Sequence, residues 1–419
     1  MIKWDEKNKF LKRRIILNEA YKHFTKIDNN SYTRTSYHFE SAISVLSNLV
    51  IFGEKSFGLD KYSIIKKAVI DEGQYSDKAD NNILIRIKEI VSEKLKIPER
   101  KFHVLTSLSI LPDDIEDHYV IDGIEINIIK TEYPSKYDGR IKLLNDKKSI
   151  IPQVFEDNYS KVIIKLKGKF EEEVIERSLN AIDLLRSVWC LFGNYEMGYS
   201  DNIYKPINRV LTGTVHSLHF ENGNNASKEI WYEPNPHSNT PFILFNNKDA
   251  FNSNTKWLLS QLNELPYRKV LKESLKTYVR AFDEKDPNVS LIRLWGALEK
   301  LLLPETSKGN SEPISKRCAF LFEDYEYHIQ VIENIRLYRN SNVYNGINTD
   351  RVRVYCYQLQ FYFKKLVIFL SHNDYDFKKL NEAQDFLDMP YNEEKLSIQK
   401  KNIQDALNFR HPKIHGVEP

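Results

Sequence analysis

The chain of 419 residues is too long for a single ordinary hydrophobic core, so two or three domains are expected. Hydrophobic residues make up 41% of the sequence and aromatic residues 12%, which is enough for folded cores and argues against a disordered chain. The 61 basic and 58 acidic residues leave a formal net charge of +3, whereas a dedicated duplex-DNA-binding or histone-like protein would carry a large basic surplus. A local basic groove is still compatible with this balance.

The cysteines and the hydropathy pattern exclude further classes of protein. Cys190, Cys318 and Cys356 are isolated in the sequence, so neither a disulfide framework nor a zinc site is expected. The first residues lack the apolar core of a signal peptide, and no run of about 18 residues is apolar enough to cross a membrane. We therefore expect a cytoplasmic protein with no metal, no other cofactor and no membrane association. The frequent Lys, Ile, Asn and Tyr residues indicate a bacterial genome of low GC content.

Residues 1–100 are expected to form a helical region, because apolar residues recur at spacings of three and four. Pro98 ends this region. The predicted helices cover residues 10–24, 38–51, 61–69 and 83–95.

Residues 101–250 show the alternating pattern of β-strands, with one long helix among them. Asp122-Gly123 lies between two such runs and is a strong signal for a two-residue hairpin. The helix is predicted over residues 171–192, where three initial glutamates suit the helix dipole. The predicted strands cover residues 102–111, 118–121, 124–129, 161–166, 215–220, 230–232 and 242–245. We expect this α+β region to sense a trigger or to position a target.

From about residue 255 the apolar pattern is helical to the end of the chain. The predicted helices cover residues 258–262, 270–282, 290–303, 314–322, 327–338, 350–372 and 393–409. The predicted fold class is therefore α+β, with a mixed helix and strand region followed by an all-α helical bundle over residues 255–419.

A short polar segment between two of these helices carries the clearest functional signal. Arg336 and Arg339 end one helix, and the Asn- and Gly-rich residues 340–346 tolerate turn geometry. Guanidinium groups recognise phosphate through paired hydrogen bonds, so the segment is a candidate phosphodiester site. On the residues alone, an ordinary polar turn with solvated arginines is the simpler interpretation.

Residues 277–370 resemble an ApeA-like HEPN domain, a member of the HEPN ribonuclease superfamily. The matching segments are YVRAF at 278–282, LIRLWGALEKLL at 291–302, KRCAFL at 316–321 and IRLYRNSNVYNG at 335–346. The last segment corresponds to the family's Arg-Asn-x-x-x-His signature, with Tyr344 at the histidine position. The resemblance implies a HEPN-type bundle and a metal-independent endoribonuclease (a hydrolase-class nuclease) that is commonly a homodimer.

The resemblance also implies roles for individual residues and partners. Arg339 would hold the RNA phosphate, Asn340 would orient Arg339, and Tyr344 would occupy the position of the proton-transferring histidine. Glu299 and Arg336 would support Arg339. The implied partners are RNA, such as tRNA, a second copy of the chain, and a phage-derived trigger or inhibitor protein. Similar proteins act as toxins in bacterial antiviral defence.

Tyr344 leaves three explanations open. The ordinary tyrosine pKa is about 10, so little phenolate exists near neutral pH to act as a base. The chain could be an inactivated variant of a toxic nuclease, or a naturally degenerate HEPN protein that binds RNA or a partner without cutting. Alternatively, Tyr344 could serve a modified mechanism. A helical interaction scaffold, in which Arg339 has no role toward phosphate, is a further alternative.

Other candidate residues give weaker signals. The segment that begins at Arg410 and includes His415 is a second, looser match to the family's arginine–histidine signature. It follows a predicted helix and ends in His-Gly, although Pro412 interrupts it. His216 and His219 lack companion metal ligands at suitable spacing. The aromatic residues between 355 and 363 could stack on RNA bases, but core or dimer packing is the simpler expectation for Tyr355, Tyr357, Phe361, Tyr362 and Phe363.

Overall fold

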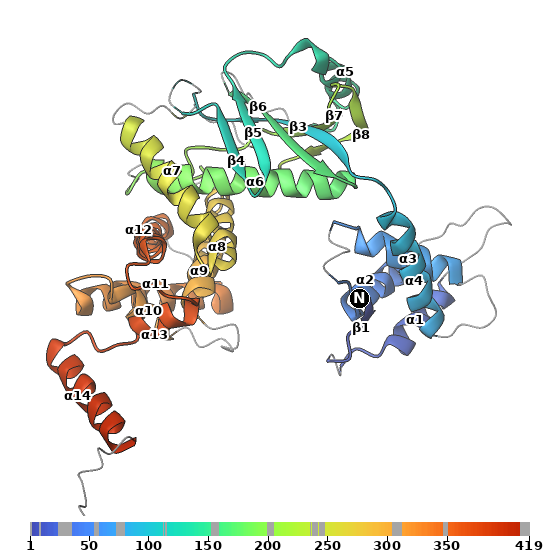
Figure 1. The fold of residues 1–419 in the computed structure, drawn as a ribbon. Helices are drawn as coiled ribbons and strands as arrows, with labels where there is room; N and C mark the ends of the chain where they lie inside the picture. The colour runs from blue at the N-terminus through green and yellow to red at the C-terminus, as the bar shows by residue number, and fades with distance from the viewer. Residues whose placement is uncertain are drawn as a thin grey trace, which may run out of the picture.

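The computed structural model describes residues 2–7, 10–23, 36–53, 58–72, 80–111, 113, 115–151, 159–198, 205–234, 236, 242, 248–303, 312–346 and 351–410. These residues form a mixed α+β structure, as the sequence predicts. Figure 1 shows a group of N-terminal helices, a β-sheet in the middle of the chain and a group of C-terminal helices.

The N-terminal region is mainly helical, as expected from the spacing of its apolar residues. Four helices pack on a core of their own, which includes Leu17, Phe39, Ile64 and Ile87. The helices are α1 (Arg13–Lys22), α2 (Tyr37–Leu49), α3 (Lys61–Glu72) and α4 (Asp80–Leu95). A short antiparallel pair joins β1 (Lys3–Trp4) to β2 (Val50–Ile51), which the helical pattern did not predict.

A six-stranded antiparallel sheet follows, with the strand order β4-β5-β6-β3-β7-β8. The strands are β3 (Arg100–Leu108), β4 (His118–Ile121), β5 (Ile124–Ile129), β6 (Ser160–Gly168), β7 (Val215–Phe220) and β8 (Asn225–Tyr232). The hairpin at Asp122-Gly123 is confirmed, since both residues have positive φ angles, as a type I′ turn requires. The strand predicted at 242–245 is represented only by an isolated bridge at Phe242, because residues 243–247 lie outside the described part.

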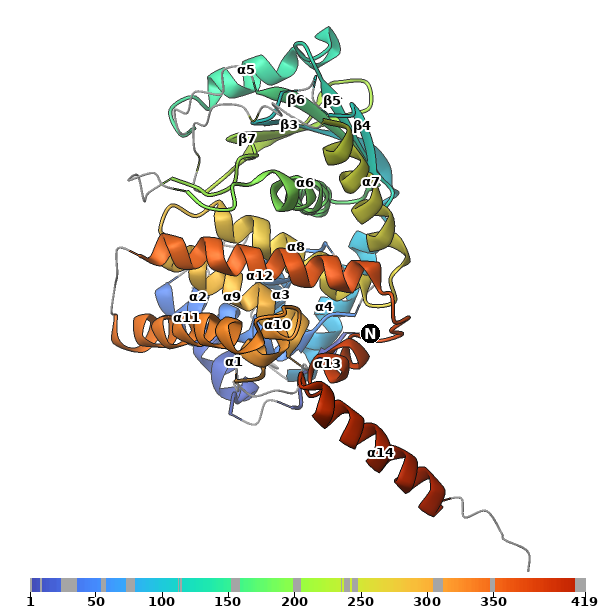
Figure 2. The same cartoon turned by 90° about the vertical axis from the view of Figure 1, so that its left-hand side faces the viewer.

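Helices cover both faces of the sheet. The helix α6 (Glu171–Gly193) packs on one face, and α5 (Gly139–Asp146), which the sequence did not predict, lies on the other. Figure 2 shows this order of layers from α5 through the sheet and α6 to the C-terminal helices. Because α6 is covered on both sides, nearly its whole second half is buried, from Ala181 to Leu191.

The C-terminal helices continue the core of the sheet without a break, since one hydrophobic cluster includes Val104, Trp189, Tyr278 and Phe363. These helices are α7 (Lys248–Glu264), α8 (Arg268–Phe282), α9 (Pro287–Leu302), α10 (Glu312–Ala319), α11 (Tyr325–Asn345), α12 (Val352–His372), α13 (Leu380–Leu387) and α14 (Glu393–Arg410). The helix α13 was not predicted. The domain boundaries expected from the sequence stay predictions.

Several expectations about single residues are confirmed. Tyr357, Tyr362 and Phe363 are buried in the core, whereas Phe361 is exposed. All three cysteines are buried and free, so no disulfide forms. Within the described ranges, none of the helices is both long and apolar enough to cross a membrane.

Candidate functional site

Two helices of the C-terminal group bring the predicted site residues together. Helix α9 begins at Pro287, where Asp286 accepts a hydrogen bond from the backbone N–H of Asn288 and caps the helix. Its far end carries Glu299. Helix α11 carries Arg339 and Asn340 and is anchored by the buried Ile332 and Ile335.

The predicted contact between Arg339 and Glu299 exists but is loose. Their closest atoms, Nη2 and Oε1, are 3.9 Å apart, and the side chains are 23% and 33% exposed. Glu299 Oε1 instead accepts a 2.9 Å hydrogen bond from the indole N–H of Trp295, one turn earlier on α9. Arg339 Nη1 donates to the side-chain oxygen of Asn340 at 3.0 Å. The Asn340 side chain therefore orients the guanidinium more closely than Glu299 does.

Arg339 keeps hydrogen-bonding capacity for a ligand. Its Nε atom is buried and has no hydrogen-bond partner among the described residues. A buried donor without a partner is costly, so such groups usually have an explanation in function or in a missing ligand. The partly exposed guanidinium is accordingly a plausible anion-binding group.

The prediction of a polar turn directly after Arg339 is wrong, because the described residues there are helical. Helix α11 continues to Asn345, and only Gly346, with φ of +66° and an N–H bonded to Asn342 O, ends it in the left-handed conformation. Asn residues are compatible with turns, but here the backbone hydrogen bonds of the helix prevail over that local preference. Arg339 and Asn340 thus lie within a continuous helix.

Arg336, which was expected to support Arg339, forms its ion pair with a different residue. Its guanidinium pairs with Glu333 at 2.7 Å on the same helix, and Glu333 also accepts a hydrogen bond from Ser315 on α10. Glu333 therefore links Arg336 to α10, and no hydrogen bond between Arg336 and Arg339 is present among the described side chains.

Two predicted site residues fall partly or wholly outside the described part of the chain. The backbone of Tyr344 belongs to the last turn of α11, but its side chain is not described. His415 lies outside the described residues, and Arg410 is exposed at the end of α14. Helix α14, which ends at Arg410, projects away from the other C-terminal helices (Figure 2).

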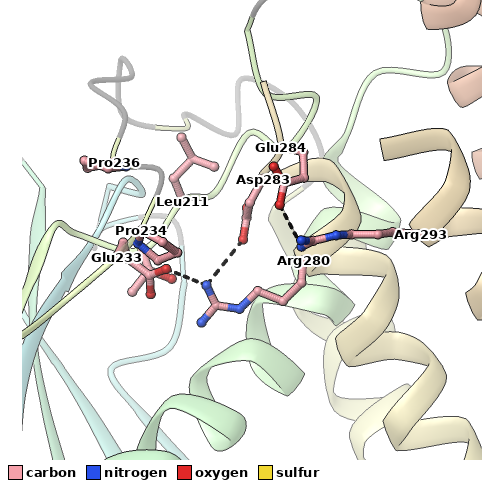
Figure 3. A pocket seen from close by; sticks show the side chains of 9 residues that line it. Leu211, Glu233, Pro234, Pro236, Arg280, Asp283, Glu284 and Arg293 are labelled. Carbon is pink, nitrogen blue, oxygen red and sulfur yellow. Dashed lines mark hydrogen bonds and ion pairs between the residues drawn. The ribbon is translucent and has the colours of Figure 1, made fainter. Parts of the chain in front are cut away.

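A pocket of about 80 Å³ lies where the sheet meets α8 and α9 (Figure 3). Arg280 points into it and pairs with Glu233 at 2.6 Å, while Arg293 pairs with Glu284 at 2.7 Å. The hydroxyl of Thr212, which also lines the pocket, is buried and has no partner among the described residues. The pocket has room for only a few water molecules.

The charges around this pocket continue into a buried network. Arg186 is fully buried and donates to Asp183 at 2.8 Å and to Asp283 at 2.6 Å. Arg280 also pairs with Asp183, which links α6 to α8. Burial alone would raise the pKa of Glu233, but the neighbouring His216, whose Nε2 atom lies 3.3 Å from Oε1, and the charge of Arg280 lower it well below the usual range. Because these carboxylates are already paired with arginines, the cluster is best explained as a structural junction.

A second pocket, of about 340 Å³, is strongly basic. It lies between α6, α8 and the β4–β5 hairpin, and its cations come from Arg177, Arg268, Lys269, Lys272 and Lys276. Lys272 and Lys276 pair with Asp122 and Glu273, respectively. No carboxylate of the described residues forms an ion pair with Arg268 or Lys269. The near-neutral composition of the whole chain is compatible with such a local basic surface.

One group of side chains has the chemistry of a metal site. The ligand atoms of Glu19, His23 and His38 all lie within 4.8 Å of one another at the junction of α1 and α2. His216 and His219, by contrast, are buried among hydrogen-bond partners in the sheet.

Sequence reasoning missed the arginine network, the basic pocket and the histidine pair. The members of each group come from segments that are distant in the chain, and a single sequence does not reveal which of these segments pack together. Only Glu19 and His23 offered a local signal, since residues four apart on a helix share a face.

Comparison with known proteins gives no match. No protein-family model, no curated protein and no solved structure is significantly similar to this chain.

Proposed function

We propose that the C-terminal helices form a HEPN-type domain that binds RNA through Arg339 and Asn340. The observation that carries the proposal is the Arg339 guanidinium, which is partly exposed, is oriented by Asn340 and has a buried Nε atom without a partner among the described residues. A phosphodiester oxygen is a suitable acceptor for such a group, because guanidinium–phosphate hydrogen bonds are charge-assisted.

In the cleaving form of such a domain, the 2′-OH of RNA attacks the neighbouring phosphodiester and no metal is needed. Arg339 would stabilise the negative charge on the phosphate, and a histidine at position 344 would transfer protons near neutral pH. With Tyr344, we expect RNA to bind but cleavage to be weak or absent near pH 7. The biological role would be that of a toxin in bacterial antiviral defence, controlled by a phage-derived trigger or inhibitor.

The basic pocket beside α6 and α8 supports an RNA ligand. Arg268 and Lys269 lie near the start of α8, without an ion pair to the described carboxylates. Cations that are not neutralised by the protein itself contribute most to phosphate binding, since they replace the counterions of the nucleic acid.

An exposed apolar residue beside Arg339 on α11 supports a second copy of the chain as a partner. Val343 is 47% exposed and lies one turn after Arg339, so the two side chains share a face of the helix. A dimer through this face would cover Val343 and would place two arginine sites near each other. Sedimentation of the wild-type protein and of Val343→Asp tests the dimer: we expect the variant to shift toward monomer, and a monomeric wild type would contradict the proposed dimer.

RNA binding tests the proposed function. We expect Arg339→Ala to weaken binding of single-stranded RNA about tenfold, which corresponds to the loss of one charge-assisted hydrogen bond. The slope of log affinity against log salt should also decrease by about 0.7, because one phosphate contact is lost. Fluorescence anisotropy of a labelled oligonucleotide measures both quantities.

Arg336→Ala is the matched control. Arg336 lies one turn earlier on α11 with a similar exposure of 24%, but it pairs with Glu333. We expect this variant to bind RNA as the wild type does. Equal losses in both variants would show that Arg339 contributes only general charge, and absence of RNA binding by the wild type would favour a partner-binding protein or a scaffold.

A further inference from the structure

The N-terminal helices bring together three side chains that the proposed RNA site does not use. Glu19 is on α1, His23 follows the last residue of that helix, and His38 is near the start of α2. His23 Nε2 and Glu19 Oε1 are 3.0 Å apart. The rings of His23 and His38 are stacked, with centroids 4.7 Å apart and planes inclined by 23°.

The helix ends hold these residues in place. The backbone N–H of His23 bonds to Glu19 O and closes the end of α1, which buries Leu17 and Ala20. At the start of α2, the Ser36 hydroxyl accepts a hydrogen bond from the N–H of Phe39, which is itself buried. The two histidines are therefore positioned by anchored backbone and not by their own contact alone.

From this arrangement we propose that Glu19, His23 and His38 bind a divalent transition-metal ion of the zinc class. Two imidazole nitrogens and a carboxylate oxygen are a common zinc ligand set, which leaves the fourth position to water. Calcium and magnesium prefer oxygen ligands alone, so the two histidines favour zinc or its neighbours. This inference is independent of the proposed RNA site and revises the expectation from the sequence that no metal binds.

The distances fit this assignment after small side-chain movements. Ligand bonds of about 2.0–2.2 Å place two donors on a tetrahedral ion roughly 3.3–3.6 Å apart. The 3.0 Å pair is already close to this separation, and the group as a whole lies within 4.8 Å. Rotation of the exposed His38 side chain would close the remaining difference.

Lys22 completes the surroundings of the carboxylate. Its ammonium group lies 3.0 Å from Glu19 Oε2, whereas the other oxygen of Glu19 faces His23. Hydrogen bonds to the outer atom of a metal ligand commonly fix its orientation.

The test is calorimetric titration of the full, metal-free chain with Zn²⁺. We expect one ion to bind with micromolar affinity and to raise the thermal unfolding midpoint, because binding selects the folded state. Titration with Co²⁺ should give the visible absorption of a four-coordinate ion.

Glu19→Gln and His38→Gln, which preserve side-chain size, should each weaken Zn²⁺ binding at least about tenfold. The control is His118→Gln, which removes an exposed histidine on β4 that belongs to no such group among the described residues. Its affinity should equal that of the wild type. Circular dichroism establishes that each variant is folded. Unchanged binding in both site variants, or no binding by the wild type, would overturn the proposal.

Discussion

At the scale of single residues, the ion pairs of each arginine indicate whether its role is structural or ligand-binding. Arg186 and Arg280 are saturated by carboxylates, and Arg336 is paired with Glu333. Arg339 differs from these three because its nearest carboxylate, on Glu299, is 3.9 Å away. Burial and pairing therefore distinguish the structural arginines from the candidate phosphate-binding one.

Replacing the buried Arg186 should be strongly destabilising. Arg186→Met leaves Asp283 without its closest arginine and removes the two hydrogen bonds that Arg186 donates to Val210 O. Removal of one partner from a buried ion pair typically costs about 3–5 kcal/mol. Urea unfolding followed by circular dichroism measures the change.

The control for this change lies on the same helix. Arg177 is 33% exposed and pairs with Glu173, so Arg177→Met should cost less than about 1 kcal/mol. Similar losses in the two variants would mean that the buried network contributes no more than a surface pair does.

At the scale of elements, periodicity predicted most helices and strands, and the Asp122-Gly123 turn predicted the hairpin register. The elements that were predicted wrongly or missed have physical explanations. Helix α11 extends past Arg339 because helical backbone bonds outweigh the turn preference of its asparagines. Short helices such as α5 and α13 bury only a few residues each and so leave a weak apolar pattern.

Only part of the candidate site could be predicted from the sequence. The motif located Arg339 and Asn340, and the resemblance suggested Glu299. Glu333 and Arg336 lie three residues apart within the predicted helix 327–338, so their ion pair was open to prediction from the sequence but was not predicted. The basic pocket depends on the packing of α6 against α8, which no local pattern encodes.

The face of the sheet beneath α5 should make stability depend on pH. His103 and His219 are opposite each other on β3 and β7, and burial lowers the pKa of each to about 4. In the unfolded chain their pKa is about 6.5, so the unfolded state takes up protons first as the pH falls. Stability should therefore decrease between about pH 6.5 and 4, by up to about 1.4 kcal/mol per pH unit for each histidine.

Urea unfolding at about pH 7 and 5 measures this dependence. The double variant His103→Gln/His219→Gln removes both groups and should show a smaller decrease in the free energy of unfolding. If the wild type and the double variant lose the same amount, the two histidines do not control the acid sensitivity of the fold.

At the scale of the whole molecule, α14 is set apart from the rest. None of its residues is buried, and Figure 2 shows it projecting from the other C-terminal helices. A chain that ends at Asn392 keeps the stacking of Tyr391 on Tyr325 and should unfold at the same urea concentration as the full chain. A clearly lower midpoint would show that α14 packs on the body in solution.

The sheet and the C-terminal helices share one core, whereas the N-terminal helices have their own. The helix α6 lies between the sheet and α8, and the Arg186 network ties these layers together. Packed side chains therefore connect the sheet with the helices that precede Arg339. This continuity is compatible with a sensing role for residues 101–250.

The cleavage of tRNA in EDTA by the Tyr344→His protein tests the proposed HEPN function most directly. We expect Tyr344→His to cut RNA, the unchanged chain to cut little or not at all, and Tyr344→His/Arg339→Ala to be inactive. These results would establish a metal-independent ribonuclease site that depends on Arg339. If Tyr344→His binds RNA but does not cut it, or if the double variant cuts equally well, the assignment of Arg339 and position 344 to a ribonuclease site is contradicted.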